Sequence, residues 1–317
     1  VTWDEAVVVS GTPTLTLSNN DVASYASGSG SSALVFTTTI AENDAASSDL
    51  SVSSYSGTIT DAAGGAAAAA SGDLGSVTVD GDAPDLSSVA ATDATYKIGD
   101  NLDITVTWDE AVVVSGTPTL TLSNSATATY QSGTGNAALV FRYTVADGNT
   151  DSSDLSVSSF SGTITDAAGG AAAAASGDLG AVIVDANTPD ITGCDATDDT
   201  YAIGETISIT CTYNEAVTVT GTPTITLSNS DVASYASGSG STGIVFSTTV
   251  ASGDTASSDL SVSSIDTTAG GATMKDSNGN SASSSMTGGD LGTVVVDADT
   301  PDITGCDATD GDYGVGE

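Results

Sequence analysis

The residues best able to do chemistry in this sequence are acidic side chains gathered in three short segments. Each segment has the pattern Asp-x-Asp/Asn-x-Pro-Asp. Three oxygen-bearing side chains thus fall within six residues, and the proline stiffens the backbone between them. Such oxygens are the ligands that Ca²⁺ prefers, and the ion takes about six to eight of them. We therefore predict calcium at these segments, with the ligands Asp80, Asp82, Asp85, Asp185, Asn187, Asp190, Asp297, Asp299 and Asp302.

Other reactive groups are scarce. The 317 residues include 41 Asp and Glu, three Lys and Arg and no histidine, for a formal charge of −38. Without histidine there is no Ser-His or Cys-His catalysis and no imidazole metal site. Three cations cannot neutralise a row of phosphates, so we expect no binding to nucleic acid or to anionic membranes. No apolar run reaches the roughly 20 residues that a membrane span needs, so we expect no direct membrane insertion.

The sequence repeats itself. Residues 1–19 recur identically at 106–124 and return with changes from residue 211, so that Trp3, Trp108 and Tyr213 are each 105 residues apart. The third unit is seven residues longer, and its extra residues fall within 266–289. A period of this length is too long for a solenoid turn and suits one small β-sandwich.

Short alternating runs fill each unit. Residues 102–108 place Leu102, Ile104, Val106 and Trp108 on one face, which is the pattern of a half-buried strand. Turn clusters separate many similar runs, and helical periodicity is almost absent. The Gly-Gly-Ala-rich stretches are predicted to be loops. The pattern therefore predicts an all-β chain of tandem immunoglobulin-like sandwiches arranged as an extended string. We predict an Ig-like repeat lacking its first strand at 1–82, complete repeats at 83–187 and 188–299, and the first strand of a further repeat at 300–317.

The loops of such sandwiches predict additional calcium ligands. In a seven-strand sandwich, the first and fifth inter-strand turns lie where the chain leaves, and the second and sixth lie where it enters. We expect Asp100, Glu205, Asp154 and Asp259 from the departing repeat to flank the acidic segments. The arriving repeat would contribute Glu110 and Glu215. Without a cation, these like charges would repel one another and loosen the junction.

Two motifs have competing interpretations. The Asp109-Glu110 pair resembles the two carboxylates of a glycoside hydrolase. Adjacent positions of a strand point to opposite faces, however, so we predict a structural role and no enzymatic activity. Residues 276–280, Asp-Ser-Asn-Gly-Asn, resemble the start of a calcium loop but lack the distal glutamate of an EF-hand, and we predict a turn.

The ordered motifs Y-x-I-G-[DE], I-x-V-T-W-[DE]-E-A-V, V-x-G-T-P-T-L-T-L and G-T-I-T-D-A-A-G-G cover the whole chain. Together they resemble the tandem bacterial Ig-like repeats of giant surface adhesins and extracellular matrix proteins, including cyanobacterial surface proteins of the SwmB type. The resemblance implies a structural role at the cell surface. The chain departs from it at D-A-A-G-G, where such repeats usually have D-x-x-G-N, and only residues 276–280 come closer.

We expect a structural extracellular protein, a calcium-stiffened string that serves as an adhesin stalk or as a surface filament or matrix fibre. Its partners would be other repeats of the same or identical chains, with any surface or polysaccharide ligand outside this segment. The alternative is a carbohydrate- or surface-binding module that uses loops at one sandwich end. Adaptation to high salt, where screening weakens repulsion, would explain the acidity without any binding role, and the two interpretations are compatible.

The cysteines allow an internal comparison. Cys194 and Cys211 occupy the positions of Val89 and Val106, so two valines on adjacent predicted strands change to cysteine together. Facing positions of antiparallel strands come close enough for a bridge. We predict a Cys194–Cys211 disulfide, an oxidising compartment and an unpaired Cys306. The chain ends have two interpretations: the sequence is a window cut from a longer array, or it is a subunit that donates residues 300–317 to another copy. Donation would leave the completed strand without counterparts of Leu102 and Ile104, which favours the window.

Overall fold

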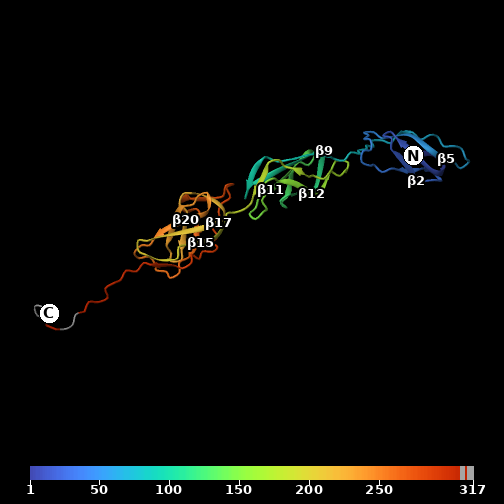
Figure 1. Cartoon of the computed structure of the whole chain (residues 1–317). Helices are drawn as coiled ribbons and strands as arrows, with labels where there is room; N and C mark the ends of the chain where they lie inside the picture. Colours follow the sequence, from blue (N-terminus) through green and yellow to red (C-terminus); the bar gives the residue numbers. More distant parts are fainter. Residues whose placement is uncertain (308–310, 313–317) are drawn as a thin grey trace. The chain divides into compact units, whose positions relative to one another are not determined.

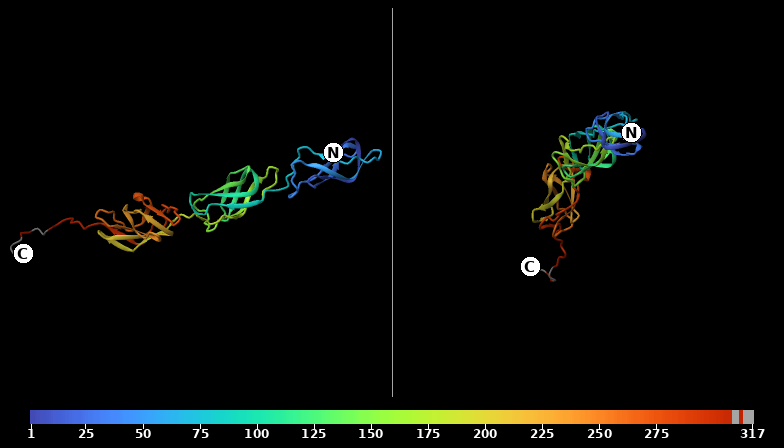
Figure 2. Two further views of the ribbon diagram at one scale, coloured as in Figure 1. Left: turned by 90° about the horizontal axis from the view of Figure 1, so that it is seen from above. Right: turned by 90° about the vertical axis from the view of Figure 1, so that its right-hand side faces the viewer.

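The computed structural model describes residues 1–307 and 311–312 of the chain, and β-strands dominate them (Figure 1). Within these residues the one helical segment is a 3₁₀ turn, Ala269–Gly271, which lies in the longer third repeat. No helix in the described part is long and apolar enough to cross a membrane. The predicted all-β class is confirmed, with antiparallel sheets typical of β-sandwiches (Figure 2).

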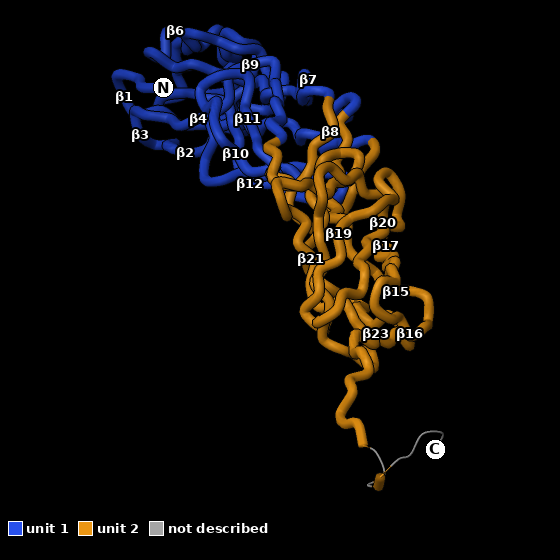
Figure 3. The backbone as a smooth tube through the Cα atoms, turned by 90° about the vertical axis from the view of Figure 1, so that its left-hand side faces the viewer, with its two compact units in different colours: residues 1–93, 102–143, 154–181 blue, residues 94–101, 144–153, 182–317 orange. Residues whose placement is uncertain are grey.

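Two compact units divide the chain (Figure 3). Unit 1 comprises residues 1–93, 102–143 and 154–181, and unit 2 comprises residues 94–101, 144–153 and 182–317. One sheet of unit 1 has the strand order β4-β2-β1-β5-β6, with β3 paired to β1. Its strands are β1 (Thr2–Leu17), β2 (Val22–Ser27), β3 (Ser31–Ala33), β4 (Val35–Thr37), β5 (Ser51–Asp61) and β6 (Gly72–Asp73).

A second sheet is organised around one long strand. Its order is β10-β11-β9-β12-β13, with β7 added to β9. The strands are β7 (Leu86–Ala90), β9 (Asn101–Leu122), β10 (Thr127–Ser132), β11 (Asn136–Thr144), β12 (Ser156–Thr165) and β13 (Gly177–Asp178). The run predicted at 102–108 is thus the first part of the longer strand β9. Where β9 and β12 shift register, Gly162 has φ 122°, and a Cβ there would lie 2.6 Å from the Cα of Pro118.

The remaining sheets lie in unit 2. The largest has the order β15-β17-β20-β19-β18-β21, with β22 paired to β17, and two small parallel pairs join β14 to β8 and β23 to β16. The strands are β8 (Ala94–Lys97), β14 (Val182–Asp185), β15 (Ile191–Ala196), β16 (Asp199–Ala202), β17 (Thr206–Thr220), β18 (Thr224–Leu227), β19 (Val232–Ser237), β20 (Ser241–Thr249), β21 (Val262–Asp266), β22 (Thr273–Lys275) and β23 (Val294–Asp297). Residues 300–307 form no strand, and the rest of the predicted further repeat lies largely outside the described residues.

Burial follows the predicted alternation. Leu102, Ile104, Val106 and Trp108 are all at most 1 % exposed, while the intervening residues are more accessible. The Trp108 indole donates a hydrogen bond to the carbonyl of Ala173. This bond holds the alanine-rich stretch, which is not helical, against the core. Burial of large alternating side chains is the main favourable term here, at about 1.5–3 kcal/mol for each fully buried side chain.

The predicted disulfide is present in the structure. Cys194 on β15 lies directly opposite Cys211 on β17, and their sulfur atoms are 1.99 Å apart. Val89 and Val106 are paired in the same register between β7 and β9. Cys306 is exposed and has no disulfide partner among the described residues. The bridge therefore replaces an apolar cross-strand pair at an equivalent position.

We predict that the bridge stabilises the third repeat. The C194V/C211V variant restores the valine pair of the second repeat and should fold, but its free energy of unfolding should fall by about 3 kcal/mol, because the unfolded chain regains loop entropy. Urea denaturation of the oxidised protein and of the variant measures the difference. Non-reducing peptide mapping of native material is the direct check, and a free thiol at either cysteine would contradict the bridge.

Candidate metal centre

The acidic segment at residues 80–85 is fastened to the strands and loops of unit 1 by its backbone. The N–H of Asn43 donates to the carbonyl of Gly81 at 2.7 Å. Further along, the N–H of Asp85 donates to Asp109 Oδ1 at 2.8 Å, and the N–H of Asp109 returns a bond to Asp85 at 3.0 Å. These contacts fix where the side chains of the segment point.

Three carboxylates from separate elements converge beside this segment. Asp80 comes from the segment, Glu110 from β9 and Asp166 from the turn that follows β12, and one oxygen from each lies within 4.8 Å of the other two. Two oxygens that bind one Ca²⁺ at about 2.4 Å each can be at most about 4.8 Å apart. The group, called the first cluster below, therefore fits around a single ion.

Asp166 is the buried member of the first cluster. Its side chain is 4 % exposed, and Oδ1 accepts backbone N–H bonds from Ala168 at 2.7 Å, Gly169 at 2.6 Å and Gly170 at 2.9 Å. Oδ2 has no hydrogen-bond partner among the described residues. Leaving a buried acceptor unsatisfied costs about 1–3 kcal/mol, and more when it is charged. Asp166 Oδ2 is therefore an oxygen ligand that a bound cation would satisfy.

Space is available at that oxygen because residue 170 is glycine. A Cβ at Gly170 would collide with Asp166 Oδ2 and would lie 3.2 Å from the backbone carbonyl oxygen of Asp82. The same region opens into a hollow lined by Glu42, Asn43, Asp80, Asp82, Ala83, Asp85, Asp109 and Glu110. Six of these eight residues are acidic and none is a cation. A backbone carbonyl and converging carboxylates are the kinds of oxygen donor that a calcium site uses.

Electrostatics at Glu110 reflect this crowding. Burial raises the pKa of Glu110 above its ordinary value, and the charges of Asp166, Asp80, Asp109 and Asp82 raise it further. Each neighbour is a like charge that disfavours ionisation. The first cluster is thus strained in its fully ionised form, which a divalent cation would relieve.

A further group of acidic residues, called the second cluster below, lies around Glu215 in unit 2, although its carboxylate oxygens do not form a group within 4.8 Å among the described residues. It consists of Asp185, Glu215 and Asp276, and burial raises the pKa of Glu215, followed by the charges of Asp276 and Asp185. Asp276 is 5 % exposed, and its Oδ1 accepts the N–H groups of residues 278–280. The predicted turn at 276–280 is confirmed. Glu215 Oε1 has no hydrogen-bond partner among the described residues.

The structure groups part of the predicted ligand set. Asp80 and Glu110 meet in the first cluster, Asp82 and Asp85 line its hollow, and Asp185 and Asp190 act on the charge of Glu215. Asp109 borders the hollow too, although its neighbour Glu110 was expected on the opposite face, because Asp109 turns to accept the Asp85 N–H.

Other predicted ligands lie elsewhere. The carboxylate of Asp100 accepts the N–H of Lys97, and that of Glu205 accepts the N–H of Ala202, so each closes the turn in which it lies. Among the described residues, the first cluster is the one group of three convergent acidic side chains, and Asp80 and Glu110 are its two predicted members. The predicted ligands outside it include Asp100, Asp154, Asn187, Glu205, Asp259, Asp297, Asp299 and Asp302. Asp297, Asp299 and Asp302 are all exposed, and Asp297 accepts the N–H of Asp299.

Sequence reasoning missed Asp166 and Asp276. Each is the first residue of a short motif that directly follows a strand. Asp166 begins D-A-A-G-G after residues 163–165, and Asp276 begins D-S-N-G-N after residues 273–275. The motif was interpreted only as a turn, since its aspartate commonly accepts nearby N–H groups. The signal that could have revealed it is the recurrence of this aspartate in every repeat. A turn uses only one carboxylate oxygen, so the second oxygen is available to bind another group.

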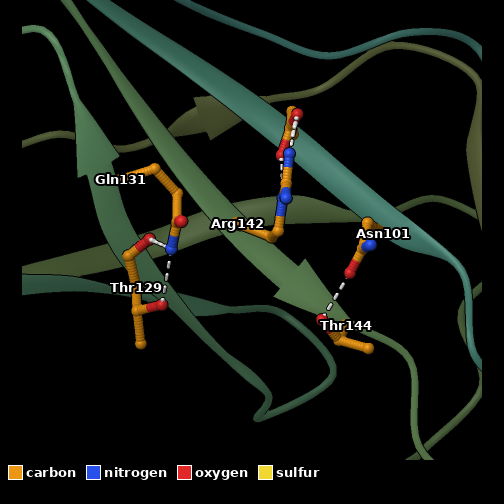
Figure 4. Close-up of polar contacts among 6 residues, drawn as sticks. Asn101, Thr129, Gln131, Arg142 and Thr144 are labelled. Atoms are coloured by element: carbon orange, nitrogen blue, oxygen red, sulfur yellow. Dashed lines mark hydrogen bonds and ion pairs between the residues drawn. The ribbon is translucent and has the colours of Figure 1, made fainter.

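Arg142, one of the few cations, is committed elsewhere. Its Nε and Nη2 donate to the two oxygens of Asp103, each at 2.6 Å, between β11 and β9 (Figure 4). Arg142 holds the pKa of Asp103 below its ordinary value through these bonds. Polar contacts between Thr144 and Asn101 and between Gln131 and Thr129 lie around the pair. The pair is exposed and contributes little stability.

Comparison with known proteins identifies no relative: no protein-family model matches the chain, and no curated protein matches it.

The raised pKa of Glu110 predicts an acid-side stabilisation of the calcium-free protein. A carboxyl whose folded-state pKa is raised contributes stability that is fully present below its unfolded-state pKa, ordinarily 4.5, and is lost as the pH rises through the folded-state value. Unfolding in urea with chelator should therefore become harder as the pH falls from about 7 toward about 5. In E110Q this gain should shrink, because one of the two raised carboxyls is gone. An equal gain in E110Q would contradict the assignment to Glu110.

Proposed function

We propose that the chain is a structural extracellular repeat protein, a calcium-stiffened string of Ig-like domains that forms an adhesin stalk or a surface filament or matrix fibre. One observation carries the proposal. The buried Asp166 Oδ2 has no hydrogen-bond partner among the described residues, and it lies in a cluster with Asp80 of the acidic segment and Glu110 of β9.

A cation in the first cluster would join three parts of unit 1 that otherwise repel one another. Asp80 belongs to the segment after the first repeat, whereas Glu110 and Asp166 belong to strand β9 and to the turn after β12 of the second. Ca²⁺ has the charge and the coordination number to bind all three together with the Asp82 carbonyl. Binding would replace repulsion with attraction and would restrict the motion of the segment.

Two further features support a structural role outside the cell. Near-identical repeats suit a spacer, because most of the sequence recurs from copy to copy. The Cys194–Cys211 bridge supports an oxidising compartment, where disulfides persist. With three Lys and Arg in 317 residues, the surface is kept soluble by acidic charge and is poorly suited to anionic partners.

We predict that calcium lengthens and stiffens the chain in solution. Small-angle X-ray scattering should give a larger maximum dimension and a narrower distance distribution with Ca²⁺ than with EGTA. The D166N variant is the matched comparison, since its amide keeps one acceptor oxygen and nearly the same shape. It should lose most of the calcium response at the first cluster.

Thermal unfolding supplies an independent check of the same site. A ligand at about 100 times its Kd stabilises the folded state by about 2.7 kcal/mol. The unfolding transition of the part that contains the first cluster should therefore move to higher temperature with Ca²⁺, and it should move less in D166N. Identical scattering and melting with Ca²⁺ and with EGTA would remove calcium from the proposal.

A further inference from the structure

One of the positions at which the two clusters differ controls access to the buried aspartate. Residue 170, the last of the D-A-A-G-G motif, is glycine, and the corresponding last residue of D-S-N-G-N is Asn280. The Asn280 side chain is 2 % exposed and lies against the second cluster. Its Nδ2 donates to Asp276 Oδ2 at 2.9 Å and to the carbonyl oxygen of Asp185 at 3.2 Å. The amide thus occupies the position that Gly170 leaves open in the first cluster.

The orientation of the Asn280 amide is fixed by a third bond. Its Oδ1 accepts the N–H of Ile98 at 2.9 Å, and a backbone N–H can only donate. The Nδ2 group must therefore face Asp276 and Asp185, where it supplies hydrogen atoms to the same kinds of oxygen that a cation would bind. Asp276 Oδ2 consequently has a partner, whereas Asp166 Oδ2 has none among the described residues.

Other donors in unit 2 hold the acidic segment at residues 185–190. Asn278 Nδ2 donates to Asp185 Oδ2, and Asn187 Nδ2 donates to Asp151 Oδ2. The Lys97 ammonium donates to the carbonyl of Gly279 at 3.3 Å, which brings one of the few positive charges of the chain to the motif. The second cluster is thus surrounded by amide and ammonium donors.

The first cluster lacks the amide donors of the second at the equivalent positions. Ala168 stands at the position of the donor Asn278, Asp82 at that of the donor Asn187, and Ala46 at that of its acceptor Asp151. Each change removes a hydrogen bond or turns an amide into another carboxylate. The segment at residues 80–85 is therefore left with acidic side chains and open space, while the segment at residues 185–190 is bonded to protein groups.

We propose that the two clusters differ in their requirement for calcium, and that the residues at positions 168 and 170, or 278 and 280, decide it. The first cluster needs a bound divalent cation to hold residues 80–85. The second holds residues 185–190 through Asn278 and Asn280 and binds Ca²⁺ more weakly, with Glu215 left as its unpartnered oxygen donor. This inference rests on the calcium site of the proposed function, and it makes one junction of the chain responsive to calcium and another permanently closed.

Limited proteolysis of the full chain tests the inference at each segment separately. A serine protease that cleaves after acidic residues is used with Ca²⁺ or EGTA, and mass spectrometry assigns the cuts. Removing Ca²⁺ should speed cleavage within residues 80–85 by about tenfold or more, because bound ligand suppresses local opening in proportion to its concentration over Kd. Cleavage within residues 185–190 should change less than about twofold.

Exchanging the motif residues should exchange the behaviour. In A168N/G170N, calcium should no longer affect cleavage at residues 80–85, whereas N278A/N280G should make residues 185–190 sensitive to EGTA. G170A is the control for volume, since it adds a Cβ without a donor and should leave the segment open in calcium and in EGTA alike. Near-UV circular dichroism checks that each variant is folded, and the two opposite exchanges keep the test informative if one of them fails to fold.

The outcomes separate this inference from the proposed function. If calcium protects neither segment in the unaltered chain, the proposed calcium site itself is wrong. If calcium protects both segments equally and D276N abolishes the protection of residues 185–190, the calcium site stands and the inference is overturned. Calcium-dependent protection that survives in A168N/G170N would also overturn it.

Discussion

Converging carboxylates constrain this molecule more than any other interaction, because their mutual repulsion must be compensated wherever the fold brings them together. In unit 1 the backbone bonds of residues 81 and 85 hold the acidic segment beside β9, so that Asp80, Glu110 and Asp166 approach within the reach of one ion. The turn after β12 satisfies Oδ1 of Asp166, while the buried Oδ2 has no hydrogen-bond partner in the part of the chain that the structure describes. The sheets hold these carboxylates in place, and the negative charge on the carboxylates favours the binding of a cation from solution.

The repeated sequence contains two solutions to that constraint on nearly the same backbone. Around Asp276 the compensation comes from within the chain, through Asn280 and the nearby Lys97. Around Asp166, Gly170 and Ala168 stand at the positions of Asn280 and Asn278, and we propose that a cation supplies the compensation instead. Because protein donors are always present and a cation is present only at sufficient concentration, the two arrangements differ in how the environment controls them. A few substitutions in a short motif are enough to move a junction from one arrangement to the other.

Much of the fold follows from the sequence because strand alternation and repeat period are direct consequences of which side chains are buried. Leu102, Ile104 and Val106 alternate as a strand requires, and the aligned Val89 and Val106 locate the Cys194–Cys211 bridge. The site was less predictable. Asp100 was expected to reach the acidic segment, but its carboxylate closes its own turn. Asp166 was overlooked because a local turn explains one of its oxygens, and only the packing of Gly170 against Asp82 reveals that the other is buried without a partner.

The central claim is that Asp166 Oδ2 and its neighbours bind a divalent cation, and anomalous X-ray diffraction tests it most directly. Crystals of the chain grown with Ca²⁺ and exchanged into Mn²⁺ or Tb³⁺ would locate the ion by its anomalous signal without assumptions about its ligands. The account predicts a peak in the first cluster, about 2.3–2.6 Å from Asp166 Oδ2 and from an oxygen of Glu110 in the calcium form. Well-ordered side chains with no anomalous peak there, and a water molecule or a protein donor on Asp166 Oδ2 instead, would contradict it.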